Sequence, residues 1–584
     1  MDHHVDYEML HQRRTLAKVF SWVKKTEPRT QTRDLNIFPF VDRSLINYDK
    51  YHKYVGDAGM KYHMSIQATR GCPYKCFYCD IYKTNPIHNR RSVDNFFEEV
   101  QMLADLGIKR FEFIDDIFNV NRKSCKAFFE KIIKSNLKLY FAFPVGLKGD
   151  LLDEELIDIM VEGGALGLSF SLEHAADRMQ KIMRKNLNVQ KLHDNLTYIT
   201  KKHPQVNLKL NAMHGFPTET EEEANMTLDF MRSIKYIDWP YLHNVRIFPG
   251  TEIEVFALEQ GIPKEIIKKS QDMSYHEHAE TLPFSKEFTN GIKTKFLMDC
   301  VINKKRLIER IPHQLNLFTR EELDQKIDAY FVGNRIKNLD DLLKVAKIKK
   351  DEIDIDGGVK EKDVKVENLN EKFKKVFSKN IQYKDNPLKI LLIDLSTYYS
   401  ADADDRQYNV VEPPLGLLAL MTFINEKLKG KVKGKIVKSL VDFDSNEELL
   451  ELIDTFKPDL IGFRAMTFYS GFFHDVVNFL RNNNITTPIL AGGPYPTASY
   501  SDVLKDKNVN AVAIAEGEFT LYEICNKMIE KGNKFLSYDE LDQIKGIAYY
   551  NPEKKSIRSI EDDKIASIPI SNHIDEIIRN PIKD

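Results

Sequence analysis

The sequence has almost no net charge and no long apolar run. Lys and Arg together number 85 against 87 Asp and Glu, a formal net charge of -2. Charge alone would therefore recruit neither nucleic acid nor an anionic membrane. No apolar run approaches the roughly 20 residues that span a bilayer, and the first residues lack a signal-peptide pattern. We expect a cytoplasmic protein without a nucleic-acid partner or membrane span, acting on a small molecule or peptide.

Cysteine is scarce, and half of it stands in one place. Six cysteines occur in 584 residues, and Cys72, Cys76 and Cys79 fall within eight positions. The other three are scattered, unlike a disulfide framework, and we expect them to be buried. Thiolates select iron–sulfur clusters or zinc, so the clustered three predict one soft metal centre with a free ligand position. The alternative is a zinc knuckle completed by His63 or His88.

The chain is too long for one hydrophobic core, and its first large unit alternates strands with helices. Six strands are predicted, at residues 64–69, 110–114, 138–143, 167–172, 206–213 and 243–248. A closed eight-fold barrel would need two further repeats, whereas residues 261–346 are largely helical. We therefore predict an α/β fold with a partial (β/α)6 barrel over residues 61–260 and a helical extension after it.

A second α/β unit is predicted over residues 388–560, after a charged linker at residues 347–387. Its strands are expected at residues 388–395, 435–441, 460–463, 488–491 and 511–515. Interleaved helices favour a doubly wound, Rossmann-like sheet whose ligand lies beyond the carboxyl ends of the strands. Residues 546–550 and 556–560 predict a terminal hairpin, and residues 561–584 a tail. Residues 1–60 read as a lead-in that contains a basic helix over residues 7–25.

The stretch from Arg70 to Cys79 resembles the defining motif of the radical SAM superfamily. In that motif Cys-x3-Cys-x2-Cys follows the first strand and an aromatic residue precedes the last cysteine, a place that Tyr78 fills. The resemblance covers about residues 35–260. It implies that the cysteines bind a four-iron four-sulfur cluster whose open iron holds S-adenosylmethionine, with Tyr78 beside the adenine. An electron from flavodoxin or ferredoxin then yields a 5′-deoxyadenosyl radical, so the cofactors carry the chemistry.

Further segments that resemble the family stand at the predicted strand ends, where a barrel holds its ligand. Asp-Asp-x-Phe after the second strand implies a contact to the methionine ammonium. The segment after the fourth strand resembles Gly-x-Glu-Ser, with His174 in place of the serine. A basic pair one helix later matches a residue that contacts the carboxylate. The Phe-Pro-Gly-Thr segment after the sixth strand matches a turn that packs on both faces of the adenine. The residues implied for S-adenosylmethionine are Tyr78, Asp115, Asp116, Ser171, Glu173, Lys185, Phe248 and Pro249.

Residues 388–560 resemble the cobalamin-binding domain that accompanies many radical SAM enzymes. Glycines at its strand ends let the backbone approach a large ligand. The Asp-x-His-x-x-Gly motif that gives cobalt a histidine is absent, and His474 is typical of a helix surface. The resemblance leads us to expect this domain before the radical SAM domain, so the order here is reversed. The residues implied for cobalamin are Leu415, Gly416, Thr467, Gly492, Gly493, Glu516 and Gly517.

Together these features predict a cobalamin-dependent radical SAM methyltransferase acting at an inert C–H bond. One alternative keeps the radical chemistry for rearrangement or cyclisation and uses the second domain for docking. A remote alternative is a zinc-stabilised binding protein. The favoured arrangement docks the two domains in one chain, but the second domain could instead serve a second radical SAM chain or bind no cobalamin. Beyond the three cysteines, no catalytic residue is predicted.

Overall fold

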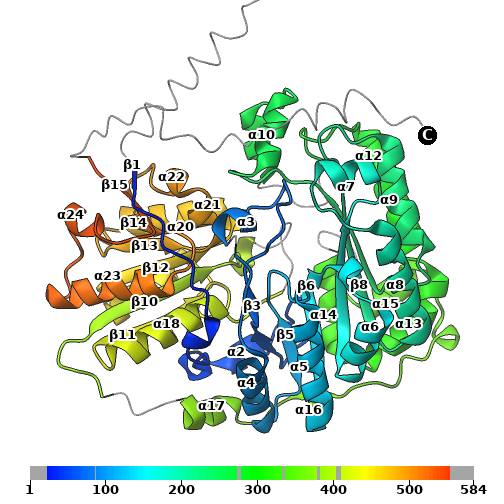
Figure 1. Cartoon of the computed structure of the whole chain (residues 1–584), viewed down its shortest axis with the longest axis horizontal. Helices are drawn as coiled ribbons and strands as arrows, with labels where there is room; N and C mark the ends of the chain where they lie inside the picture. The colour runs from blue at the N-terminus through cyan, green and yellow to red at the C-terminus, as the bar shows by residue number, and fades with distance from the viewer. Residues whose placement is uncertain are drawn as a thin grey trace, which may run out of the picture.

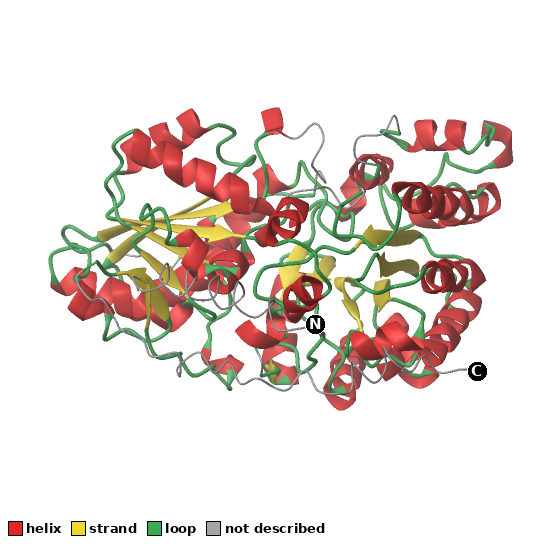
Figure 2. Cartoon of the chain, turned by 90° about the horizontal axis from the view of Figure 1, so that it is seen from above, coloured by secondary structure: helices red, strands yellow, loops and turns green. Residues whose placement is uncertain are grey.

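Two sheets stand side by side and are flanked by helices (Figures 1 and 2). The computed structural model describes residues 23–85, 87–271, 278–331, 336–377, 382–402 and 410–552. One sheet is built from residues 64–244, and the other from residues 388–550 together with a strand near the N-terminus. The chain therefore forms two α/β units, as the sequence predicts.

The six-stranded sheet follows chain order, and all of its neighbouring strands are parallel. Its strands are β2 (Met64–Ile66), β5 (Arg110–Phe113), β6 (Tyr140–Leu147), β7 (Ala165–Glu173), β8 (Asn207–His214) and β9 (Trp239–Asn244). Parallel strands need long crossovers, which helices supply here. These helices are α4 (Val93–Asp105), α5 (Arg122–Ser135), α6 (Glu154–Glu162), α7 (Asp177–Ile182), α8 (Val189–Lys202) and α9 (Glu221–Ser233). The arrangement confirms the predicted (β/α)6 fold.

Helix α5 shows how the sequence builds this unit. The side chain of Asn121 caps its first turn, and Asn136 ends it in the left-handed region with φ of 55°. Between them Cys125, Phe129 and Ile132 recur at spacings of three or four and are buried. An apolar stripe of this period turns one face of a helix toward a core. The same burial holds for the other two scattered cysteines, as predicted.

Two elements of this unit differ from the prediction. Helix α8, which buries Leu192, Leu196 and Ile199, lies in a stretch for which no helix was predicted. Strand β9 begins at Trp239, four residues before the predicted strand, and includes Pro240. A proline is tolerated there because β9 is an edge strand. The apolar residues after Asn244 consequently leave the sheet and reach toward the second unit.

The second sheet has the order β1-β15-β14-β13-β12-β10-β11. Five of its strands are parallel in the doubly wound order predicted for a Rossmann-like domain. They are β10 (Leu388–Leu395), β11 (Val432–Lys438), β12 (Leu460–Ala465), β13 (Ile489–Gly492) and β14 (Ala511–Ala513). The main helices around them are α18 (Leu415–Leu428), α19 (Asn446–Phe456), α20 (Ser470–Asn482), α21 (Pro494–Ala498) and α23 (Glu518–Glu530).

The outer edge of this sheet corrects the end of the basic helix predicted over residues 7–25. Strand β15 (Ile547–Tyr550) pairs antiparallel with β14 and with β1 (Val23–Lys25). The last three residues of the predicted basic helix are therefore a strand, because edge pairing satisfies their backbone groups. Residues 7–22 of that helix lie outside the described residues. So do residues 556–560, the second strand of the predicted hairpin.

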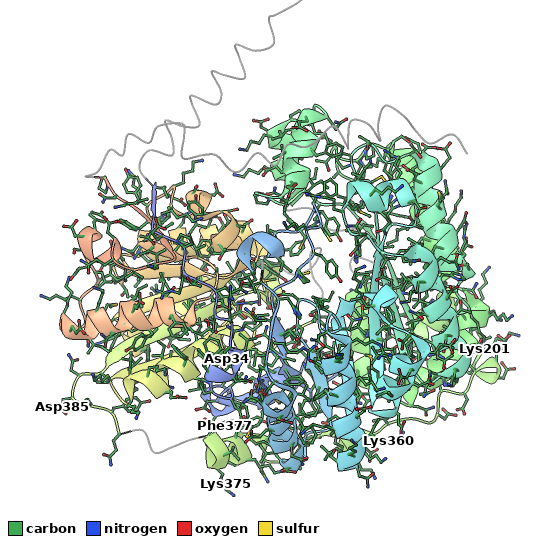
Figure 3. The ribbon with its side chains drawn as sticks, viewed as in Figure 1. Asp34, Lys201, Lys360, Lys375, Phe377 and Asp385 are labelled. Carbon is green, nitrogen blue, oxygen red and sulfur yellow. The ribbon has the colours of Figure 1, made fainter. Side chains whose placement is uncertain are left out.

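The segment between the two sheets is helical and packed. Its helices are α10 (Glu252–Glu259), α11 (Lys264–Gln271), α12 (Lys286–Phe296), α13 (Lys304–Leu315), α14 (Arg320–Tyr330), α15 (Leu339–Val345), α16 (Glu361–Val364) and α17 (Leu369–Phe377). Within the predicted charged linker, α17 buries Leu369 and Phe373 beside α2 (Tyr48–Tyr51). This part is thus more than a solvated crossover. Figure 3 shows Phe377 at the foot of the six-stranded unit and Asp385 at the foot of the other.

The segment after β1 runs between the two units (Figure 1). On one side the Phe38 ring packs on Phe423 and Phe519 of the second unit, with centroid distances of 5.7 and 6.2 Å. On the other side the amide of Asn89 donates to the carbonyl of Thr32 at 2.8 Å. The predicted lead-in therefore contacts both units and sits in the seam between them.

Candidate functional site

The cysteine loop begins where a small antiparallel ribbon closes. Strands β3 (Thr69–Arg70) and β4 (Asn89–Arg90) pair at its base. Gly71 follows with φ of 82°, and a Cβ there would come within 2.3 Å of the Ile87 carbonyl oxygen. The Gly71 amide donates to Asp116 at 2.8 Å. Because only glycine fits this conformation and this space, the first cysteine leaves the ribbon in a fixed direction.

The three thiols suit a cluster better than a zinc ion. In the described part of the chain, the only three His, Cys, Asp or Glu side chains whose ligand atoms all lie within 4.8 Å of one another are His63, Glu112 and Glu412. The three cysteine sulfurs are therefore spaced more widely than this. Zinc bonded to sulfur at about 2.3 Å would hold tetrahedral thiolates ~3.8 Å apart. The candidate zinc ligands are engaged elsewhere: His63 contacts Glu412, and Nε2 of His88 lies 3.1 Å from the carbonyl oxygen of Ile117. A cluster places its thiolates farther apart than a single ion does.

The thiols are partly buried. Burial raises the pKa of the Cys79 thiol to about 12. Metal ligation requires the thiolate, so binding a cluster here must release protons.

Three of the residues implied for S-adenosylmethionine meet beside this loop. Glu173 stands at the end of β7 with φ of 61°, a left-handed conformation that is strained for a side chain of its kind. Its Oε1 accepts a hydrogen bond from Lys185 at 2.7 Å and one from the Tyr78 hydroxyl at 3.4 Å. Residues far apart in sequence thus form one polar cluster next to the last two cysteines.

The two aspartates after β5 have different surroundings. Asp115 is 2% exposed and accepts hydrogen bonds from the Ala68 amide and the Thr69 hydroxyl. Burial raises the pKa of Asp115 to about 6. Asp116 binds the amide of Gly71 and lines the cavity described below. Asp115 therefore holds the strand end in place, while Asp116 remains open to a ligand.

The substitution of His174 for serine has a structural explanation. Nε2 of His174 lies 3.0 Å from Glu219, and both side chains are fully buried. The other carboxylate oxygen of Glu219 accepts from the amides of Gly215 and Phe216 at 2.6 and 2.8 Å. This pair fixes the loop after β8. Ser171 packs on Gly146, where a Cβ would come within 2.8 Å of the serine oxygen.

Phe248 and Pro249 stand at the boundary with the second unit. The Phe248 ring meets Phe468 edge to face at 5.2 Å. The guanidinium of Arg246 lies 5.2 Å from the same Phe468 ring. In this structure Phe248 contacts the loop that also carries Thr467. The sequence indicates this turn but not its partner, because aromatic pairing across the seam leaves no local pattern.

A cavity of about 440 Å³ lies between the carboxyl ends of the two sheets. The six-stranded unit contributes Arg70 and Asp116 to its wall. The second unit contributes six of the seven residues implied for cobalamin, which are Leu415, Gly416, Gly492, Gly493, Glu516 and Gly517. The seventh, Thr467, is not part of the lining. One chamber therefore joins the base of the cysteine loop to the glycine-rich strand ends.

The glycines of this chamber fit a large ligand. A Cβ on Gly416 would meet no atom within 4 Å, and one on Gly492 would find its nearest neighbour at 3.9 Å. Side chains at these positions would project into open space, so glycine keeps the wall free for close approach. His474 does not line the cavity, because its ring lies 2.8 Å from the Tyr495 hydroxyl and 3.2 Å from Asp506.

Arg70 ties the cysteine loop to the second unit, and sequence reasoning missed this contact. Its guanidinium lies 2.7 Å from Glu518 and 3.6 Å from Glu516, and also stacks over Phe38 at 4.7 Å. The Arg70 and Glu518 side chains are 17% and 7% exposed. The only signals were an arginine before the motif and an acidic pair at a distant strand end.

The comparisons with known proteins agree with this geometry. Residues 66–231 match the family model of the Radical SAM superfamily, and residues 408–524 match that of the B12 binding domain. An uncharacterized methyltransferase of Pyrococcus horikoshii is 25% identical over 242 residues, covering 41% of this chain and 50% of the relative. The ribosomal protein uS12 methylthiotransferase RimO of Chlamydia felis is 26% identical over 206 residues, covering 33% and 43%. The chain thus spans about half the length of the curated relatives it matches.

Among solved structures, the radical S-adenosylmethionine methyltransferase TsrM of Kitasatospora setae is 18% identical with a TM-score of 0.32. The match covers 37% of this chain and 41% of that one. The cobalamin-dependent enzyme OxsB is 15% identical with a TM-score of 0.25, covering 38% and 31%.

The fold and the site define an α/β protein with two cofactor domains. The chain carries a radical SAM domain followed by a B12-binding domain, in the order read from the sequence. These domains imply a four-iron four-sulfur cluster, S-adenosylmethionine and cobalamin as its cofactors. In the described part of the chain, no helix is long and apolar enough to cross a membrane.

Proposed function

We propose that this chain is a cobalamin-dependent radical SAM methyltransferase that methylates an inert carbon of a small molecule or peptide. One observation carries the proposal: the cavity of about 440 Å³ is walled by the base of the cysteine loop on one side and by glycine-rich strand ends on the other. The three cysteines, Tyr78, Glu173 and Lys185 lie outside the cavity lining, so the cysteine loop meets the chamber through Arg70 and Asp116 at its base. The docking of both domains in one chain favours action in cis over service to a second chain.

Different residues of the chain would bind the cluster and S-adenosylmethionine. Cys72, Cys76 and Cys79 hold the cluster, and Glu173 with Lys185 presents a charged pair to the amino acid end of S-adenosylmethionine. Tyr78 is partly buried, and its hydroxyl donates to Glu173 at 3.4 Å. When bound, the cluster and S-adenosylmethionine supply a 5′-deoxyadenosyl radical, and cobalamin supplies a transferable methyl group.

The experiment is anaerobic incubation of the reconstituted full chain with methyl-labelled S-adenosylmethionine, hydroxocobalamin and a reductant such as flavodoxin, ferredoxin or dithionite. We expect both 5′-deoxyadenosine and S-adenosylhomocysteine. Cys76→Ala should abolish 5′-deoxyadenosine, whereas Cys300→Ala, a buried cysteine of the helical segment, should keep it. Formation of 5′-deoxyadenosine alone would contradict methyl transfer and favour rearrangement or cyclisation. Zinc without iron in the purified chain would contradict the radical chemistry altogether.

A further inference from the structure

A second group of metal-ligand side chains lies in the seam, and the proposed function does not use it. His63 precedes β2, Glu112 lies in β5, and Glu412 lies in the second unit, three residues before Leu415. Nε2 of His63 is 3.1 Å from Oε2 of Glu412 and 3.8 Å from Oε2 of Glu112. The three ligand atoms lie within 4.8 Å of one another. Two carboxylates and one imidazole thus converge from both domains.

One short loop fixes all three side chains by their opposite ends. The amide of Asp57 donates to Oε1 of Glu412 at 2.7 Å, and the amide of Ala58 donates to Oε1 of Glu112 at 3.1 Å. Nδ1 of His63 lies 2.9 Å from the carbonyl oxygen of Met60. Outer contacts of this kind orient metal ligands and set the imidazole tautomer. The second ligand atom of each side chain faces the common centre, where the Ser65 hydroxyl also donates to Oε2 of Glu412 at 3.0 Å.

The inner oxygen of Glu112 lacks a donor. The Glu112 side chain is fully buried, and its Oε2 has no hydrogen-bond partner among the described residues. Leaving a buried carboxylate oxygen unsatisfied is costly, because the charged form loses its hydration. The atom points toward His63 and Glu412, so a cation at their centre would satisfy it.

Gly56 makes room for this arrangement. A Cβ there would come within 2.3 Å of Oε1 of Glu412 and 2.4 Å of the His63 ring. Lys326 supports the same loop from α14 by donating to the carbonyl oxygen of Ala58 at 2.6 Å. The loop is therefore packed closely around the three side chains instead of spanning the seam loosely.

We propose that His63, Glu112 and Glu412 form a binding site for one divalent cation that joins the radical SAM domain to the B12-binding domain. A donor set of one imidazole and two carboxylates suits Mn²⁺, Fe²⁺ or Zn²⁺ and neutralises their charge. Glu412 leads directly into Leu415 and Gly416, which line the cavity. A cation held here would set the position of that wall against the cysteine loop.

The test uses the full chain with its cluster reconstituted and loosely bound metals removed. Mn²⁺ alone is titrated, and free Mn²⁺ is followed by electron paramagnetic resonance. We expect one tightly bound Mn²⁺ per chain, with spin-echo modulation from one directly coordinated imidazole nitrogen. Glu112→Gln and Glu412→Gln should each weaken binding by roughly tenfold or more. The control Glu321→Gln, an exposed carboxylate paired with Lys61, should bind as the parent does.

Three results would overturn the proposal. They are no bound Mn²⁺ in the parent, bound Mn²⁺ without nitrogen coordination, or glutamine variants that bind Mn²⁺ like the parent. Should the variants not fold, the parent titration and its nitrogen signal still decide. The outcome is independent of turnover, because an enzyme that makes both products from S-adenosylmethionine can still lack this cation.

Discussion

Arg70 connects the two domains through its ion pairs. It stands two positions before Cys72, yet its charge is neutralised by Glu516 and Glu518, more than 440 residues later. If either the arginine or its carboxylate partners are removed, the group that remains is a mostly buried charge without compensation. The same residue therefore fixes the loop that holds the cluster and the strand end that lines the chamber.

Replacing Arg70 by glutamine should weaken domain docking. Because the pair with Glu518 is largely buried, we expect a loss of about 3–5 kcal/mol in unfolding free energy. Urea unfolding of the full chain measures it, together with hydroxocobalamin retention, which should fall. Arg122→Gln is the matched control, since Arg122 is 40% exposed and pairs on the surface with Asp153. That change should cost little, because solvent screens an exposed ion pair. Equal costs for the two variants would contradict the role of Arg70.

Asp394 is a buried anion of the second unit and gives a pH-dependent prediction. Burial raises its pKa, but Lys438 and Arg464, at 3.1 and 2.9 Å, outweigh burial and lower the pKa to about 2. A depressed folded pKa contributes stability that is present above the unfolded pKa of about 3.9 and is lost as pH falls toward 2. Asp394→Asn should therefore cost about 3–5 kcal/mol at pH 7 by leaving Lys438 unpaired. The urea midpoints of the parent and of Asp394→Asn should converge only below about pH 4. A difference between the two midpoints that disappears already near pH 7 would contradict this.

At the scale of elements, the strand ends were predictable and their partners were not. The cysteine spacing, the strand alternation and the glycines at strand ends are local patterns, and they indicated the partial barrel, the doubly wound sheet and seven of the residues that line the cavity. The pairing of β1 with β15 and the contact of Phe248 with Phe468 depend on how two units dock. No local period encodes such contacts, and only their geometry in the fold shows them.

The glycine strand ends give an element-scale prediction about cobalamin. Gly416→Leu and Gly492→Leu should each weaken hydroxocobalamin binding by about tenfold or more, because the new side chains would enter the chamber. Stability should change little, since the Cβ positions meet no atom within 3.9 Å. Gly471→Leu is the control, because its Cβ would also meet nothing within 4 Å and it lies outside the cavity lining. Anaerobic equilibrium dialysis decides; unchanged retention in all three variants would place cobalamin elsewhere.

At the scale of the whole molecule, the seam organises the chain. The segment around Phe38, the Arg70 ion pairs and the His63 cluster all join the same two units. Each contact involves side chains that lose their partners if the domains separate. This domain order therefore presents no obstacle to a shared chamber, because the docking is made by side chains from both halves and from the N-terminal segment.

The most direct test of a shared chamber is the magnetic interaction between its two cofactors. The full chain is loaded with cob(II)alamin and a reconstituted cluster, and its cobalt signal is recorded by electron paramagnetic resonance before and after one-electron reduction of the cluster. We predict clear broadening of the cobalt signal on reduction, and its absence when Cys72, Cys76 and Cys79 are replaced by alanine. A cobalt signal that is retained by the chain but unchanged by cluster reduction would contradict the account.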